Sequence, residues 1–255
     1  MSPVIHIGCC GWSYLNERDF TGELAGKYSS KLQAYATLFD TVEINSTFYR
    51  LPRLSTAEKW RREADEINPG FEFTVKVFKG ITHLHRFQKN ESLVSFKIIR
   101  DISSALRARC VLLQSPASFK PTPENIANMR FFFERIDRAD LEIVWEPRGT
   151  WYDRPEMIVR VCEENGLVHC VDPFRNDIVP LRKNMTAYFR LHGFGEPTIY
   201  LYDFSKEELA HLHRKIQSLP PGFTNVYVLF NNDACYRDAR TFQTTEWGFQ
   251  KKRTS

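Results

Sequence analysis

Eight short apolar runs recur along the 255-residue chain and leave little choice of fold. They are too apolar for strands with one wet face, so they predict strands buried on both sides, as in a parallel sheet. Eight runs in 255 residues give about 32 residues per repeat, the spacing of a (β/α)8 barrel. The runs are Val4–Cys9, Thr41–Asn45, Phe71–Lys76, Cys110–Gln114, Leu141–Glu146, Leu167–Val171, Ala187–Leu191 and Val226–Phe230.

Segments with apolar residues at helical spacing separate most of these runs. Ser205 with Glu208 three residues later predicts a capping box at the start of the last such segment. The alternation predicts a protein of the α/β class, a single TIM-type barrel over residues 1–249 followed by a basic tail, 250–255. A doubly wound open sheet is the rival; no GxGxxG turn follows the first run, so a dinucleotide-binding domain is not expected. The expected helices are Ser29–Leu38, Thr56–Ile67, Glu91–Leu106, Pro123–Ile136, Pro155–Asn165 and Ser205–Leu219.

Composition narrows the class of protein further. No run of about 18 apolar residues could span a membrane, and the first residues do not resemble a signal peptide. None of the 6 cysteines forms a CxxC pair, so we expect reduced thiols and a cytoplasmic protein. The net charge of +4 is mildly basic. This charge would allow binding of nucleic acid or of a phosphorylated small molecule, and it is equally typical of an ordinary enzyme surface. It does not predict the oligomeric state.

Polar residues end nearly every one of the apolar runs. In a barrel of this type the chemistry lies at the carboxyl ends of the strands, so these side chains are expected to surround one polar pocket. Ionised groups on buried strands are costly unless they are paired or used. The candidates are Glu43, Asn45, Lys76, Gln114, Glu146, Arg148, Asp172, Arg190, His192, Asn231 and Asn232.

Aromatic residues occupy the expected loops at the same end of the barrel. Trp12, Tyr14 and Tyr49 are candidates for ligand binding, with Phe48 and Trp151 nearby. Aromatic rings beside cations are suited to stacking on nucleobases or sugars. The alternative is that they only pack the loops together.

Several motifs along the chain together resemble the DUF72 family, the YecE-like proteins. They include Val42–Pro52 (VEINSTFYRLP), Gly8–Tyr14 (GCCGWSY), Phe71–Lys76 (FEFTVK), Glu146–Arg148 (EPR) and Tyr188–Gly193 (YFRLHG). The resemblance covers nearly the whole chain and implies a TIM barrel. It implies no particular reaction, because the family has none assigned.

Within the expected pocket the residues suggest phosphodiester chemistry. Lys76, Arg148 and Arg190 would hold phosphate, unless each of them only pairs with a carboxylate. Glu146 or Asp172 would activate water and His192 would protonate the leaving oxygen. The amides Asn45, Gln114, Asn231 and Asn232 would orient the substrate.

Three questions about this pocket stay open at the level of the sequence. No residues are assigned as metal ligands: a multi-zinc centre is not expected, whereas a single divalent ion on oxygen ligands remains compatible with the sequence. The phosphodiester chemistry would make the protein a nuclease-like enzyme, and an isomerase acting on a small sugar or sugar phosphate is an alternative to it. A non-catalytic ligand-binding module is a third.

Overall fold

Eight parallel strands close into one barrel in the computed structural model, which describes residues 2–24, 28–182 and 185–245. Each strand pairs with the next along the chain, and β1 pairs with β8 through contacts such as Val4 with Asn225 and Cys9 with Phe230. The pairing of β1 with β8 closes the sheet, so the predicted barrel is confirmed and the open sheet is excluded. The strands are β1 (Val4–Cys9), β2 (Thr41–Ile44), β3 (Glu72–Lys76), β4 (Cys110–Gln114), β5 (Glu142–Glu146), β6 (Leu167–Val171), β7 (Thr186–Leu191) and β8 (Asn225–Phe230).

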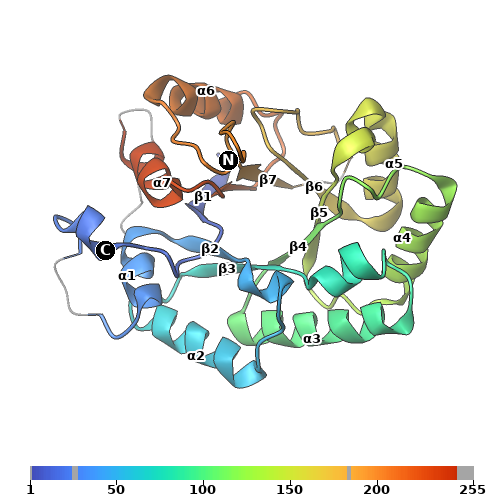
Figure 1. The fold of residues 1–255 in the computed structure, drawn as a ribbon, viewed down its shortest axis with the longest axis horizontal. Helices are drawn as coiled ribbons and strands as arrows, with labels where there is room; N and C mark the ends of the chain where they lie inside the picture. Colours follow the sequence, from blue (N-terminus) through green and yellow to red (C-terminus); the bar gives the residue numbers. More distant parts are fainter. Residues whose placement is uncertain (1, 25–27, 183–184, 246–255) are drawn as a thin grey trace.

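Seven α-helices in the described part of the chain form a ring around the strands (Figure 1). The capping box predicted at Ser205 is present: its hydroxyl accepts from the Glu208 amide, and the Glu208 carboxylate accepts from the Ser205 amide. The helices are α1 (Lys31–Leu38), α2 (Leu54–Asp65), α3 (Asn90–Leu106), α4 (Pro123–Arg135), α5 (Pro155–Asn165), α6 (Lys206–Gln217) and α7 (Cys235–Thr244).

The link from β6 to β7 departs from a regular barrel. Its described residues, 172–182 and 185, form no helix. Pro173 and Pro180 explain this, because each lacks an amide hydrogen and restricts the residue before it, which leaves too short a stretch between them for a stable helix.

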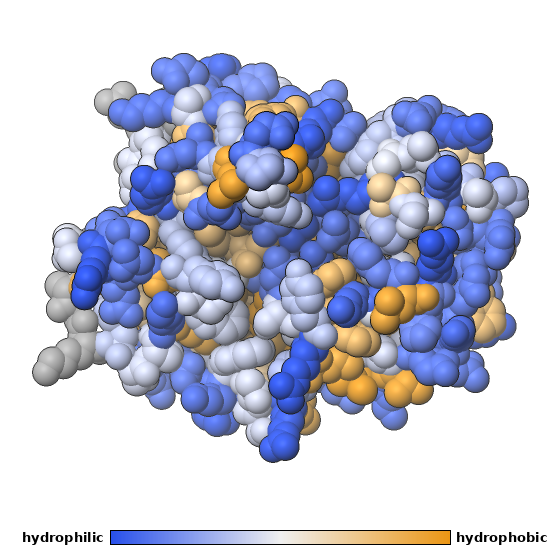
Figure 2. Space-filling view, in the orientation of Figure 1, coloured by the Kyte–Doolittle hydropathy of each residue, from blue (hydrophilic) through white to orange (hydrophobic). Residues whose placement is uncertain are grey.

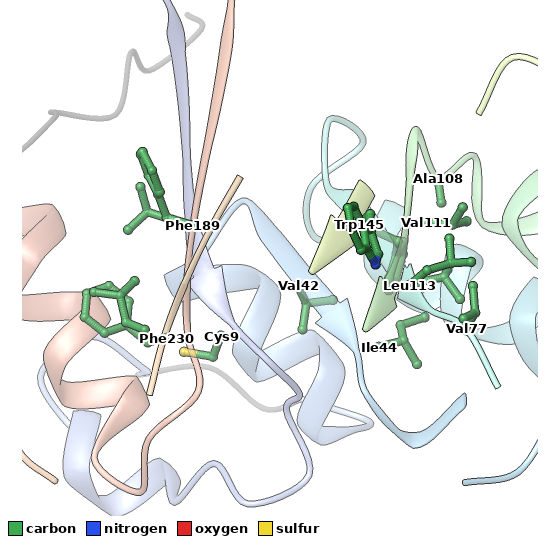
Figure 3. Packing of buried hydrophobic residues seen from close by; sticks show 14 of the residues in the cluster. Cys9, Val42, Ile44, Val77, Ala108, Val111, Leu113, Trp145, Phe189 and Phe230 are labelled. Atoms are coloured by element: carbon green, nitrogen blue, oxygen red, sulfur yellow. The ribbon is translucent and has the colours of Figure 1, made fainter. Parts of the chain in front are cut away.

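Side chains alternate between the two faces of the closed sheet. Val42 and Ile44 of β2 belong to the hydrophobic layer between strands and helices, whereas Glu43 between them takes the opposite direction into the barrel. Figure 3 shows part of the outer layer, with Cys9 beside Phe230 and Val111 beside Leu113. This layer fixes the strands against the helices and so fixes where the inward residues point.

A second apolar cluster fills the middle of the barrel. Tyr188 and Tyr227 stack there, with ring centres 5.2 Å apart. The barrel is therefore a packed core, and only its ends carry charged groups. The other members of the inner cluster are Cys110, Leu112, Val144, Val168, Cys170 and Leu229.

Two further expectations concern the whole chain. All six cysteines are free thiols. Among the helices of residues 2–24, 28–182 and 185–245, none has the length and apolar character needed to cross a bilayer. The basic tail expected at 250–255 lies outside the described residues.

Candidate active site at the barrel mouth

The carboxyl ends of the strands gather most of the predicted polar residues at one mouth of the barrel. The alternation that turns Glu43 inward does the same for Lys76, Glu146 and Arg190, which all end or nearly end their strands. Hydrophilic residues dominate the face of the molecule presented in Figure 2, with apolar residues in smaller separate groups. Within the mouth, the question is which charges are already paired and which are left for a ligand.

Arg190 of β7 is the centre of the charged network. Its Nε and Nη2 donate to the two oxygens of Glu43, at 3.0 and 2.8 Å, and its Nη1 donates to Glu146 Oε2 at 2.7 Å. Tyr188 supports the same pair, since its hydroxyl donates to Glu43 at 3.0 Å. Arg190 is 1% exposed, so this guanidinium holds β2, β5 and β7 together and has no face open to solvent. The sequence left open whether Arg190 holds phosphate or only pairs with a carboxylate, and in the structure it pairs with Glu43 and Glu146.

These charges set the protonation state of both partners. Burial opposes the charged form of Arg190, but the charges of Glu43 and Glu146 outweigh it and raise the pKa of the guanidinium. Burial by itself would raise the pKa of Glu146, but the charges of Arg190 and Arg148 outweigh burial and hold that pKa well below its usual value. Glu146 is therefore a fixed anion and a poor proton acceptor.

His192 and Asp172 form a second pair beside the first. His192 Nδ1 lies 3.1 Å from Asp172 Oδ2, and the backbone amide of His192 donates to the same oxygen at 3.1 Å. Because an ionised carboxylate only accepts, Nδ1 carries the hydrogen and Nε2 keeps its lone pair. Arg148 Nη2 is 2.9 Å from that Nε2 and donates to it. Burial lowers the pKa of His192, although the hydrogen bond to Asp172 acts the other way, so the ring is neutral at neutral pH.

Lys76, at the end of β3, is the cation that the network leaves without a carboxylate. Its side chain is 7% exposed, and among the described residues no carboxylate lies within ion-pair distance of Nζ. The ammonium instead lies 4.4 Å from the centre of the Phe48 ring. Burial, together with the charge of Arg190, lowers the pKa of Lys76 to about 8, although the charges of Glu43 and Glu146 act in the opposite direction.

Arg148 is the other cation with capacity for a ligand. It pairs with Glu146 through Nη2, its side chain is 25% exposed, and its buried Nε has no hydrogen-bond partner. Arg175, which the sequence reasoning did not select, lies 3.7 Å from Asp172 and follows it by three residues. Four cationic side chains thus stand against three carboxylates at this mouth.

The amide side chains divide into two groups. Asn45 Nδ2 is 3.5 Å from Asn231 Oδ1, and both are half-buried at the mouth, as is Gln114, which pairs in register with Glu146. Asn232 lies apart from them: its Nδ2 donates to the Tyr202 carbonyl at 2.8 Å and to the Asp238 carboxylate at 2.6 Å. Alternation explains this, because the residue after an inward-facing one turns outward. Asn232 joins two loops and does not contact the charged network.

The aromatic candidates also have different surroundings. Trp12 packs edge-on against Trp60 of α2, with ring centres 5.2 Å apart, and Trp151 is buried against Trp145. These two pack loops, as the alternative interpretation held. Tyr14 and Tyr49 are 89% and 68% exposed, so their rings remain available to a ligand.

Three residues at or beneath the mouth escaped the sequence reasoning. Cys10 Sγ is 3.6 Å from Arg190 Nη2, Thr74 Oγ1 is 2.8 Å from the Tyr188 hydroxyl, and the ring of Tyr200 lies 5.8 Å from that of His192. Alternation along β1 and β3 could have indicated the first two, since both fall on the inward face. Tyr200 lies in an irregular loop with no periodic signal.

The histidines and carboxylates at the mouth do not form a metal-binding set. Across residues 2–24, 28–182 and 185–245, no three His, Cys, Asp or Glu side chains are grouped so that they could hold an ion.

Comparison with known proteins places the chain in a family. Residues 6–246 match the family model described as "Protein of unknown function DUF72". The UPF0759 protein YunF of Bacillus subtilis (strain 168) is 26% identical over 260 residues, covering 91% of this chain and 89% of that protein. A DUF72 family protein from Thermotoga maritima MSB8 is 26% identical with a TM-score of 0.72, covering 94% of this chain and 97% of that one.

A more distant structure matches in fold alone. The D-psicose 3-epimerase of Clostridium cellulolyticum H10, solved with D-tagatose, is 10% identical with a TM-score of 0.58, covering 92% of this chain and 96% of that one. The family match, in contrast, extends over nearly the whole barrel and includes every strand that contributes to the mouth. The chain therefore belongs to the DUF72 family.

Proposed function

We propose that the barrel mouth binds a phosphate-bearing ligand and hydrolyses a phosphodiester bond, with His192 as the general base. The observation that carries the proposal is Lys76, a buried ammonium group with no carboxylate partner among the described residues. A buried ammonium group with no carboxylate in direct contact is costly, because Glu43 and Glu146 act on it only from beyond ion-pair distance, and an anionic ligand would supply the contact. Arg148, partly exposed and with an unpartnered Nε, would donate to the same anion.

The pair Asp172–His192 supports the catalytic part of the proposal. Asp172 orients the imidazole through Nδ1, which leaves the Nε2 lone pair facing Arg148 Nη2 at 2.9 Å and Arg190 Nη1 at 3.4 Å. A neutral histidine held in this way is suited to removing a proton at neutral pH. Glu146 is assigned to positioning instead of water activation, because its lowered pKa makes it a weak base.

The reaction would proceed by attack of water on phosphorus. Arg148 turns from His192 to the phosphate, and Nε2 takes a proton from a water molecule as its oxygen bonds to phosphorus. The bond from phosphorus to the leaving oxygen breaks, and the imidazolium returns the proton to that oxygen. The products are a phosphomonoester and an alcohol, and the base is regenerated.

The test is hydrolysis of bis(4-nitrophenyl) phosphate and of a single-stranded oligonucleotide, with and without Mg²⁺ or Mn²⁺. We expect the wild type to release nitrophenolate and His192→Gln to be slower by 100-fold or more, the usual contribution of a general base. His211→Gln, an exposed histidine of α6, serves as the matched control and should match the wild type.

Each outcome bears on a different part of the proposal. Equal rates in wild type and His192→Gln would exclude the assigned base. Binding of the diester that depends on Lys76 but gives no product would leave a ligand-binding module. An isomerase acting on a sugar phosphate would bind that ligand and leave the diester intact.

A further inference from the structure

A cavity of about 580 Å³ lies beside the mouth and contains none of the charged network described above. The segments that follow β1 and β7, together with the loop after β8 and the first turn of α7, form it. Its volume is within the usual range for small-molecule sites. Its lining residues are Tyr14, Asn16, Asp19, Leu201, Tyr202, Asp203, Asp233, Ala234, Tyr236 and Arg237.

Each of the three loops contributes to the mouth and then to this cavity. Cys10 contacts Arg190 at the mouth, and Tyr14 lines the cavity four residues later. Tyr200 faces His192, and Leu201 lines the cavity. Asn231 belongs to the mouth and Asp233 to the cavity. The mouth and the cavity therefore share these three loops.

Hydrogen bonds hold together the loops that form the wall of the cavity. The Asp233 amide donates to the Tyr200 carbonyl at 2.8 Å, and Asn232 donates to the Tyr202 carbonyl and to Asp238. Asp238 also accepts from the Phe204 amide at 3.2 Å. The β7 and β8 loops thus form one preformed wall, which reduces the entropy lost when a ligand binds.

The lining of the cavity combines tyrosine rings with carboxylates, so it differs both from the charged mouth and from an apolar groove. Tyr14 is 89% exposed at the rim, so its ring can stack on a flat ring. Tyr236 also lines the cavity, but it is half-buried and its ring packs edge-on against Tyr35, with ring centres 6.2 Å apart. Asp203 is paired with Arg237 at 3.0 Å, and Asp19 accepts from Asn16 at 3.0 Å. The Asp233 carboxylate has no side-chain partner among the described residues, and a carboxylate can accept two hydrogen bonds from neighbouring hydroxyls.

We propose that this cavity binds the nucleoside part of a nucleotide whose phosphate lies at the mouth. Tyr14 would stack on the base, Tyr236 would contact it from the lining, and Asp233 would accept from the ribose hydroxyls. Three carboxylates against one arginine would repel a second phosphate, so the ligand is a mononucleotide or the terminal nucleotide of a strand. This inference rests on the proposed function for its phosphate site, whereas the cavity residues are independent of Lys76 and His192.

The experiment is isothermal titration of the full chain at pH 7 with adenosine 5′-monophosphate, ribose 5-phosphate, adenosine and inorganic phosphate. We expect the nucleotide to bind at least 10-fold more tightly than ribose 5-phosphate, because only it carries a stacking ring. Tyr14→Ala and Asp233→Asn should each weaken nucleotide binding by about 5- to 100-fold and leave inorganic phosphate unaffected. Asp140→Asn, an exposed aspartate outside both sites, is the matched control.

The variants separate the two proposals. Lys76→Met should weaken the binding of adenosine 5′-monophosphate, ribose 5-phosphate and inorganic phosphate, and it should leave the binding of adenosine unchanged. Adenosine binding that depends on Tyr14 and Asp233, with no gain from the phosphate, would keep the cavity assignment and overturn the phosphate site. Nucleotide affinity that is the same in the wild type, Tyr14→Ala and Asp233→Asn, or equal to that of ribose 5-phosphate, would overturn the cavity assignment, as would the absence of any binding.

Discussion

Arg190 shows how one side chain can organise the end of a barrel. Glu43 and Glu146 are both buried, on β2 and β5, and each would be costly alone. The planar guanidinium offers donors along two edges, so it meets both oxygens of Glu43 and one of Glu146 at once. A lysine, with one ammonium group, could not reproduce this fork.

The first prediction concerns removal of that fork. Arg190→Met leaves two glutamates buried without their main counter-ion, so we expect the free energy of unfolding to fall by about 3–5 kcal/mol. Urea denaturation followed by circular dichroism measures it. Lys59→Met, which removes an exposed partner of Glu63, should change stability by no more than about 1 kcal/mol. A loss for Arg190→Met as small as that of the control would mean that water screens the network.

Residue identity and position predicted which polar groups reach the mouth, but not how they pair. Glu43 and Arg190 are separated by 146 intervening residues, and only the register of the closed sheet decides that they meet. The same limit left open, at the level of the sequence, which of Lys76, Arg148 and Arg190 pairs with a carboxylate. Asn232 lies apart from the network for a local reason, because the alternation of β8, continued past its end at Phe230, turns it away from Asn231.

At the scale of the elements, the sequence predicted helix starts well, because the hydrogen bonds that cap a helix join residues close together in the chain. The start of α6 followed from Ser205 and Glu208, and the start of α4 and α5 from Pro123 and Pro155, which occupy their first positions. The loops after β1, β7 and β8 gave no comparable signal, since their conformations depend on contacts between segments far apart in the chain. For that reason the cavity beside the mouth could not be predicted from the sequence.

The capping box of α6 gives a prediction at this scale. Ser205→Ala removes the acceptor for the Glu208 amide, which lies 3.2 Å from the hydroxyl, so we expect a loss of about 1 kcal/mol in the free energy of unfolding. Chemical denaturation measures the loss. Ser205→Asp keeps an acceptor at the same position and should restore most of the stability. If both variants lose the same amount, the contribution comes from packing and not from the cap.

At the scale of the whole molecule, barrel closure turns five separate strand ends into one electrostatic site. The ammonium of Lys76 is kept in a buried position near Arg190, and this lowers its pKa to about 8. A lysine in the unfolded chain has a pKa of about 10.4. The folded protein therefore releases this proton more readily than the unfolded chain, and it releases it within a pH range that is accessible to experiment.

That difference predicts opposite pH trends for ligand binding and for stability. As the pH rises through about 8, Lys76 loses its charge, so affinity for a singly charged phosphodiester such as dimethyl phosphate should fall. Between about 8 and 10.4 the unfolded chain binds more protons at this site than the folded protein does, so the ligand-free protein should gain stability. Both trends are measured as differences between the wild type and Lys76→Met, whose side chain does not titrate. An affinity that stays level up to pH 10 in the wild type would mean that Lys76 is not the anion-binding group.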